Sequence, residues 1–146
     1  MTIIEFRIPA VPKGQPRQAQ RVVVPKGGKP FAMNYMPKGA PIHNFKATVR
    51  MAAEKSYVGP PLTGPLRVDM TFVFPRSKAQ TWKTRPMPRI PHDKKPDRDN
   101  CDKAVLDALK GLMFIDDCQA CDGRIQKWIA AGDEQPHVMV RVETIE

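Results

Sequence analysis

The sequence has little of what secreted, membrane-bound or zinc-binding proteins require. Its 146 residues include three cysteines and three histidines, and no apolar run approaches the roughly 20 residues of a membrane span. The first ten residues alternate apolar with charged side chains and lack the apolar segment of a signal peptide. We therefore expect a cytoplasmic protein with reduced thiols and no membrane partner.

Negative charge is scarce in the first third of the chain. Residues 1–50 contain nine Lys or Arg and one acid, and residues 76–98 contain eight against two. Residues 99–146 reverse this balance, with ten acids against five Lys or Arg, within a net charge of +9. Such a distribution is typical of a polyanion-binding protein with an acidic site, although a basic surface that serves only solubility is the alternative.

The length and the hydrophobic periodicity predict one domain over residues 1–146, with an α+β fold. Alternating patterns predict strands over 3–9, 20–24, 66–74, 124–130 and 137–145. Helical spacing predicts one helix from Ile42 to the break at Gly59, and a second from about Asp99 to Leu112. We expect a mixed sheet of about four to five strands packed by the two helices, with residues 75–96 as a long basic surface loop.

Two aspartates, Asp97 and Asp99, precede the second helix. Side chains two apart in an extended segment point the same way, so both carboxylates can face one ion, and Asp99 or Asn100 would cap the helix. Asp99, Lys103 and Asp107 follow at one-turn spacing, opposite an apolar stripe. The simpler interpretation of this spacing is the solvated face of an amphipathic helix.

A second acid pair, Asp116 and Asp117, follows the glycine that ends this helix. The preceding Phe114 and Ile115 are expected to anchor the segment while the acids project from it. The two acid pairs supply hard oxygen ligands without a nearby histidine, which favours Mg²⁺, with Mn²⁺ as a substitute, over Zn²⁺. The predicted metal ligands are Asp97, Asp99, Asp117 and Asp116.

The order of these residues resembles the RusA family of Holliday junction resolvases. The family pattern K-P-D-x-D-N-x-x-K-x-x-x-D-A-L-x-G, followed by D-D-x-Q, is met by Lys95 to Asn100, Lys103, Asp107 to Leu109, Gly111, Asp116, Asp117 and Gln119. Residues 12–17, Pro-Lys-Gly-Gln-Pro-Arg, resemble the basic loop after the first strand in phage-type members. The chain departs from the pattern at Arg98 and Cys101, where apolar residues are expected, and at Ala120 and Cys121.

The resemblance implies a homodimeric, Mg²⁺-dependent endodeoxyribonuclease that cuts opposed strands of four-way DNA junctions in recombination and repair. It implies that Asp97, Asp99, Asp117 and Lys103 are catalytic, with Asp116 as an accessory acid. We expect the metal to activate water and the lysine to neutralise charge on the phosphate, with Asp107 positioning the lysine.

The basic loops over residues 12–29 and 76–98 are expected to bind the DNA backbone. The candidate DNA-binding residues are Lys13, Arg17, Arg21, Lys83, Arg85, Arg89, Lys94 and Lys95. Trp82 either stacks on a splayed base or anchors its own loop, and His92 is mainly a surface residue that could contact phosphate.

Two other classes of function remain open at this stage. A non-catalytic nucleic-acid-binding accessory protein would need the acids only for capping and solubility. A metal enzyme for small phosphorylated substrates would not need the extended basic surface, which argues against it. The spacing Cys118-x-x-Cys121 matches half a zinc site, but the chain lacks two further nearby ligands, so we interpret these as incidental thiols.

Overall fold

Strand β4 (Leu66–Phe74) lies at the centre of the main sheet. Its apolar residues alternate as predicted, with Leu66, Val68, Met70 and Phe72 buried. In this computed structural model, which describes residues 1–16, 19–82 and 86–146, β4 pairs with β8 (His137–Thr144) on one side and β7 (Ile125–Ile129) on the other.

The sheet has six strands in the order β1-β8-β4-β7-β5, with β6 beside β4. The remaining strands are β1 (Ile3–Ile8), β5 (Ile90–Pro91) and β6 (Ala120–Asp122). β8 runs antiparallel to β1 and β4, whereas β6 and β7 run parallel to β4. The predicted α+β class with a mixed sheet is confirmed, and β5 and β6 are short additions of two and three residues.

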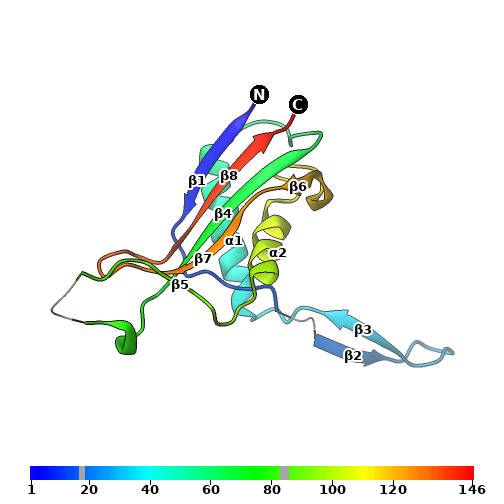
Figure 1. The fold of residues 1–146 in the computed structure, drawn as a ribbon. Coiled ribbons are helices and arrows are strands. Elements are labelled where there is room, and N and C mark those ends of the chain that lie inside the picture. The colour runs from blue at the N-terminus through cyan, green and yellow to red at the C-terminus, as the bar shows by residue number, and fades with distance from the viewer. Residues whose placement is uncertain (17–18, 83–85) are drawn as a thin grey trace.

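Two helices, α1 (Pro41–Ser56) and α2 (Arg98–Leu109), cover one face of this sheet (Figure 1). The helix predicted from Ile42 is confirmed. Of the apolar residues at helical spacing, Ile42, Phe45, Val49 and Ala53 are buried, whereas Ala52 is only half-buried. They pack with the apolar side of α2 and with the inner face of β1, β4 and β8 in one core. None of the helices in the described residues has the length and apolar character needed to cross a membrane.

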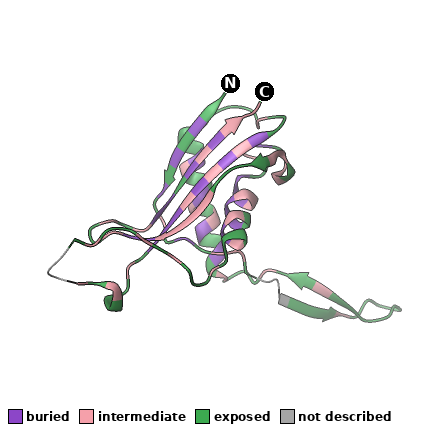
Figure 2. Cartoon of the chain, viewed as in Figure 1, coloured by how far each residue is buried: buried purple, intermediate pink, exposed green. Residues whose placement is uncertain are grey.

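The opposite face of the sheet carries charged side chains, and Figure 2 shows buried and exposed residues alternating along β1. Arg141 lies in the middle of this face. Its guanidinium contacts Glu143 at 2.7 Å, Glu5 at 3.3 Å and Asp69 at 3.8 Å. Ion pairs therefore follow the solvated side, while apolar packing holds the side that the helices cover.

The start of α2 differs from the prediction. Arg98 is the first helical residue and Asp97 is the N-cap, with φ −67° and ψ 151°. Asp99 therefore lies in the first turn and is not the cap, and the two aspartates do not share one extended segment. The helix ends at Leu109, and Gly111 turns the chain at φ +82°, a value that glycine adopts without strain.

Strand β2 (Ala19–Val23) does not join the main sheet. It forms a separate two-stranded hairpin with β3 (Phe31–Tyr35), which was not predicted, and this hairpin projects away from the body (Figure 1). The described part of the segment after β4 is mostly irregular, as predicted, but it contains one short 3₁₀ turn, η1 (Lys78–Gln80), and the two-residue strand β5. A second 3₁₀ turn, η2 (Asp117–Gln119), follows α2.

Candidate active site

An open cavity of about 810 Å³ lies at the N-terminal end of α2. Three segments line it: α2 and the residues just before it, the loop after β1, and the base of the β2–β3 hairpin. The lining residues are Gln15, Pro16, Gln20, Asn34, Lys95, Asp97, Asp99, Asn100, Lys103 and Asp107. The cavity thus brings together Asp97, Asp99 and Lys103, three of the predicted catalytic residues.

The loop after β1 is held against α2 by close backbone contacts. The amide of Gln15 donates a hydrogen bond of 2.9 Å to the carbonyl of Asn100. A Cβ atom at Gly14 would lie 2.6 Å from Cβ of Pro96, so the close approach of the two segments requires glycine there. The described part of the family-like segment, residues 12–16, therefore forms one wall of the cavity. The basic charge of the segment did not predict this role.

The polar groups of the cavity fit a hard cation. In the described residues, neither Asp97 nor Asp99 forms an ion pair. The side-chain oxygen Oε1 of Gln15 is buried without a hydrogen-bond partner there, which is costly unless a ligand or water completes it. Carboxylate and amide oxygens are the donors that Mg²⁺ and Mn²⁺ accept, and Mg²⁺ commonly uses one or two carboxylates with water and phosphate.

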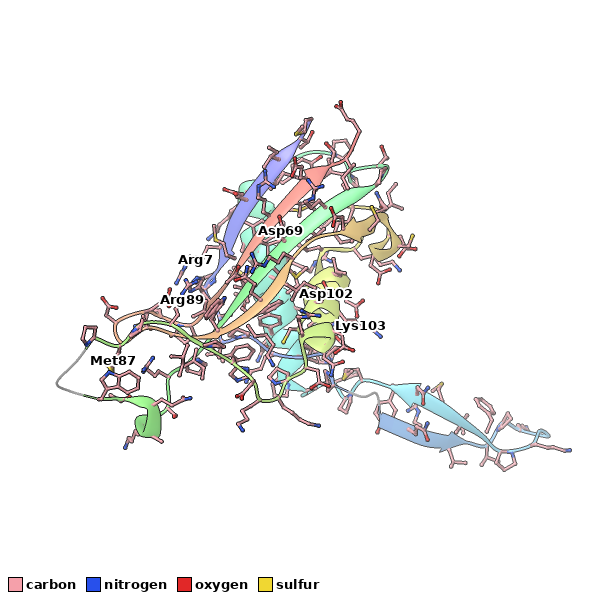
Figure 3. The ribbon with its side chains drawn as sticks, viewed as in Figure 1. Arg7, Asp69, Met87, Arg89, Asp102 and Lys103 are labelled. Carbon is pink, nitrogen blue, oxygen red and sulfur yellow. The ribbon has the colours of Figure 1, made fainter. Side chains whose placement is uncertain are left out.

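Lys103 projects from α2 (Figure 3) as predicted, but Asp107 does not hold it. The carboxylate of Asp107 pairs with Nζ of Lys46 on α1 at 3.5 Å. Arg50, one turn further along α1, donates to the carbonyl of Ala108 at 3.0 Å. The predicted positioning role of Asp107 is therefore wrong: it joins the two helices, and Lys103 has no ion pair within the described residues.

The second acid pair lies beyond the C-terminal end of α2. Asp116 contacts Nζ of Lys110 at 3.2 Å. The side chains of Asp116 and Asp117 share a hydrogen bond. This bond, and after it the hydrogen bond with Lys110, lowers the pKa of Asp116. The bond between the two aspartates raises the pKa of Asp117. Phe114 is buried and anchors this loop, whereas Ile115 is 58% exposed, so the predicted anchoring by both residues is half wrong.

Gln119 fixes the loop that carries this pair. Its Oε1 accepts hydrogen bonds from the amides of Ile115 and Asp116 at 2.8 and 2.9 Å. Its Nε2 donates to the carbonyls of Leu62 and Gly64, both at 3.0 Å. The glutamine of the D-D-x-Q motif thus joins the acidic loop to the segment before β4, and it satisfies four backbone groups with one side chain.

Asp117 does not line the cavity, and its predicted catalytic role remains a prediction. Burial, and then the negative charges of Asp117 and Asp99, raise the pKa of Asp102 on α2. We did not predict Asp102 as part of the acidic region, although its i+3 spacing from Asp99 on one helix was a usable signal. Within residues 1–16, 19–82 and 86–146, no three His, Cys, Asp or Glu side chains form a metal-sized group.

The predicted DNA-binding residues have different surroundings. Lys13, Arg21, Lys94 and Lys95 are exposed, and Lys95 borders the cavity. Arg89 instead makes a two-pronged ion pair with Glu134, which lowers the pKa of that carboxyl group to about 2. The other three, Arg17, Lys83 and Arg85, lie outside the described residues.

The rings of Trp82 and His92 each contact other side chains of the protein. The indole of Trp82 donates to the carbonyl of Pro86 at 2.9 Å and lies under the guanidinium of Arg76, which supports loop anchoring over base stacking. The ring of His92 stacks on Phe74 with centroids 4.2 Å apart.

The cysteines show no sign of a metal site. Cys118 and Cys121 are exposed free thiols, so their spacing forms no disulfide. Cys101 is fully buried where the family pattern expects an apolar residue, and burial raises its pKa to about 11. It therefore behaves as a small apolar side chain at that position, which accounts for one departure from the pattern.

Comparison with known proteins identifies the family of this chain. The family model described as endodeoxyribonuclease RusA matches residues 8–143, nearly the whole chain. A protein described as the uncharacterized protein YqaN of Bacillus subtilis (strain 168) is 28% identical over 156 residues, covering 99% of each chain. Because the family model spans both acid pairs and the loop that walls the cavity, the chain belongs to the RusA endodeoxyribonuclease family.

Proposed function

We propose that this protein is a Mg²⁺-dependent, structure-selective endonuclease that resolves four-way DNA junctions and related branched DNA in recombination and repair. One observation carries the proposal: two carboxylates without ion-pair partners in the described residues, Asp97 and Asp99, share an open cavity with Lys103 and Lys95. Membership of the endodeoxyribonuclease family supports the same reaction, hydrolysis of a DNA phosphodiester bond.

Asp97 and Asp99 are the residues that would hold the divalent ion, with Asp117 and its neighbour Asp116 as further ligands. When bound, such an ion polarises a phosphate oxygen and lowers the pKa of a coordinated water. Mn²⁺ is expected to replace Mg²⁺, since both prefer oxygen donors. The protein's own contribution is to place the oxygens of Asp97 and Asp99 at the N-terminal end of α2 without an ion-pair partner in the described residues.

Lys103 supplies positive charge where the scissile phosphate would lie. Its position one turn after Asp99, on the side of α2 that borders the cavity, suits it to neutralise charge that develops on the phosphate oxygens. Lys95 borders the same cavity and would hold the strand in place by a phosphate contact. Lysine suits both roles because its ammonium group is a compact positive charge, whereas the guanidinium of arginine is planar and binds oxygens in a fixed bidentate geometry.

The DNA backbone is expected to contact Lys13, Arg21, Lys94 and Lys95, together with Arg17, Lys83 and Arg85. Affinity should fall linearly on a log–log plot against salt, with a slope near −0.9 per phosphate neutralised. Replacing Lys94 and Lys95 by Gln should therefore flatten that slope by about two units. An unchanged slope in this variant would place the DNA surface elsewhere.

A homodimer follows from the reaction. The described residues of one chain supply one such acid cavity, and two opposed cuts in a four-way junction need two sites related by a two-fold axis. Light scattering should give twice the chain mass at working concentrations. A monomer with full junction cleavage would contradict this part of the proposal.

The decisive test uses a synthetic four-way junction and a matched duplex, each with Mg²⁺, Mn²⁺ or EDTA. The wild-type protein should cut the junction in the presence of either metal. Asp97→Asn and Asp117→Asn should each lower cleavage by about a thousandfold or more, while junction binding in EDTA stays equal or tightens because a negative charge has been removed. Lys103→Ala should lower cleavage without this gain in binding.

The control is Asp133→Asn, an exposed aspartate in the turn before β8, which should change neither property. Junction binding without cleavage under any metal would support the accessory-protein alternative. Near-normal cleavage by a folded Asp97→Asn protein would remove Asp97 from the metal site.

A further inference from the structure

The β2–β3 hairpin is a free-standing arm. Its five cross-strand pairs run from Ala19–Tyr35 at the base to Val23–Phe31 near the turn, and neither strand pairs with the main sheet. In Figure 1 it extends away from the body beyond the N-terminal end of α2. A two-stranded hairpin on its own is marginal in water, so a projecting one suggests a binding partner.

The charge of the arm indicates a polyanion as that partner. Residues 19–38 include Arg21, Lys26, Lys29 and Lys38 and contain no acidic residue. Two of these lysines lie in the turn between the strands. None of the four forms an ion pair in the part of the chain that the structure describes. Two such arms would repel one another, which argues against a second copy of the chain as the partner.

The arm also exposes apolar side chains on both of its sides. Val22 is 70% exposed, Val24 is 68% exposed and Phe31 is 50% exposed. Side chains alternate along a strand, so Val22 lies on the same side as Gln20, whereas Phe31 shares the other side with Tyr35. Apolar groups on both sides suit insertion between two nucleic-acid segments, as apolar wedges do between base steps.

The base of the arm borders the candidate active site. Gln20 and Asn34 are directly opposite each other in the hairpin, and both line the cavity with Asp97 and Asp99. A five-residue strand spans about 17 Å, and successive nucleotides of a DNA strand are about 3.4 Å apart. The turn of the arm therefore reaches about five nucleotides from the bond to be cut.

We propose that the β2–β3 hairpin inserts into the open centre of branched DNA and confers the preference for branched over duplex substrates. Lys26 and Lys29 contact phosphates, and Val24 and Phe31 pack against unstacked bases, which are available at a branch point and not within a duplex. This inference rests on the proposed junction nuclease function.

The test measures binding in EDTA, where no cleavage occurs. The DNA is a four-way junction with 2-aminopurine at its centre, compared with a duplex of the same sequence. Wild-type protein should raise the 2-aminopurine fluorescence of the junction and not of the duplex. The double variant Val24→Ser, Phe31→Ala should lose most of this rise, and its junction-over-duplex preference should fall at least about tenfold, the scale expected for lost base stacking.

The matched control is Val58→Ser, which changes a 93% exposed valine after the C-terminal end of α1 and should behave as wild type. A second variant, Lys26→Gln with Lys29→Gln, keeps the apolar residues. It should retain the fluorescence rise at saturation and flatten the salt slope by about two units. Far-ultraviolet circular dichroism and thermal melting confirm that each variant is folded.

The outcomes separate this inference from the proposed function. Two outcomes would contradict insertion of the arm into the junction. In the first, wild-type protein cuts the junction with Mg²⁺ but leaves its fluorescence unchanged. In the second, the double variant equals wild type in both readouts. A double variant that becomes monomeric while the fluorescence rise persists would also overturn it, by making the arm a dimer contact. A fluorescence rise without any metal-dependent cleavage would support insertion of the arm and contradict the proposed nuclease function.

Discussion

Asp97 and Asp99, at the start of α2, differ in their surroundings from Asp116 and Glu134, which come later in the acidic half of the chain. In the described residues, Asp97 and Asp99 have no cationic partner, although Lys95 and Lys103 border the same cavity. Elsewhere, Asp116 pairs with Lys110 and Glu134 pairs with Arg89. The sequence has more cations than acids, so the missing partners at α2 are a matter of arrangement and not of supply.

This difference indicates which carboxylates are candidates for binding a metal ion. A carboxylate that accepts hydrogen bonds from a lysine or arginine has already satisfied its charge within the protein. Two neighbouring carboxylates without such partners repel one another, and a divalent cation is the simplest compensation. Asp107, Asp116 and Glu134 are paired with cations, whereas Asp97 and Asp99 share a cavity and are available to a ligand.

Removing one carboxylate from each region should give the largest difference. We expect Asp99→Asn to lower Mg²⁺-dependent junction cleavage by about a thousandfold or more, because a metal ligand is lost. Asp116→Asn should lower cleavage no more than about tenfold, because the charge of Asp116 is partly satisfied by Lys110. Single-turnover rates at saturating protein measure both, and equal losses would remove the distinction between the two regions.

An intermediate effect is expected at the residue that positions the second acid pair. Gln119→Leu removes the hydrogen bonds to the amides of Ile115 and Asp116 and to the carbonyls of Leu62 and Gly64. Cleavage should fall by roughly 10- to 100-fold, as for lost outer-shell partners of metal sites. The loss should appear in the single-turnover rate, with little change in DNA affinity.

Gln119→Glu is the matched control, since it retains an acceptor for the two amides but loses the donor to the carbonyls, and it should fall between wild type and Gln119→Leu. Urea unfolding should show a stability loss of about 1–3 kcal/mol for Gln119→Leu. If stability falls while the cleavage rate of the folded protein is unchanged, Gln119 is a stabilising residue without influence on the site.

The smallest effect is expected at a fully paired carboxylate far from the cavity. The hydrogen bond from Arg89, aided by the amide of Ala131, lowers the pKa of Glu134 from 4.5 to about 2. Because the folded pKa lies below the unfolded one, the stabilisation is fully present above about pH 4.5 and is lost as the pH falls toward 2. Solvent screening limits it to roughly 0.5–1 kcal/mol.

Glu134→Gln should therefore lower the free energy of unfolding at neutral pH and differ less from wild type as the solution is acidified. Urea unfolding at neutral and acidic pH measures this difference. Junction cleavage at neutral pH should be unchanged, which separates this paired acid from those of α2. A stability difference that is independent of pH would show that packing, and not the ion pair, is the role of Glu134.

Most of the fold could be predicted from local patterns. The alternation along residues 66–74 and the helical spacing from Ile42 identify β4 and α1, because burial on one side imposes a period of two on a strand and 3.6 on a helix. Strand β3 was missed, because Phe31–Tyr35 is exposed and no burial constrains its sequence. The place of β2 in a separate hairpin was missed for the same reason.

The acid motif could also be predicted, but its geometry could not. Residue order identified Asp97, Asp99, Lys103, Asp116 and Asp117 as candidates. The partner of Asp107 was assigned wrongly, because Lys46 is 61 positions away in sequence and comes close only when α1 packs against α2. The role of Gln119 likewise depends on carbonyls before β4 that no local pattern connects to it.

By itself, the sequence predicted both helices, the main strands of the sheet, much of the apolar core and the candidate acids, because periodicity and residue type act over a few neighbouring positions. Only the tertiary structure decided which charges meet. It brings Gln15, Gln20 and Asn34 beside the start of α2 and leaves Asp97 and Asp99 without partners in the described residues, while it gives Asp107, Asp116 and Glu134 theirs. The physical reason is that an ion pair forms over a few ångströms, a distance fixed by helix and sheet packing and not by separation along the chain.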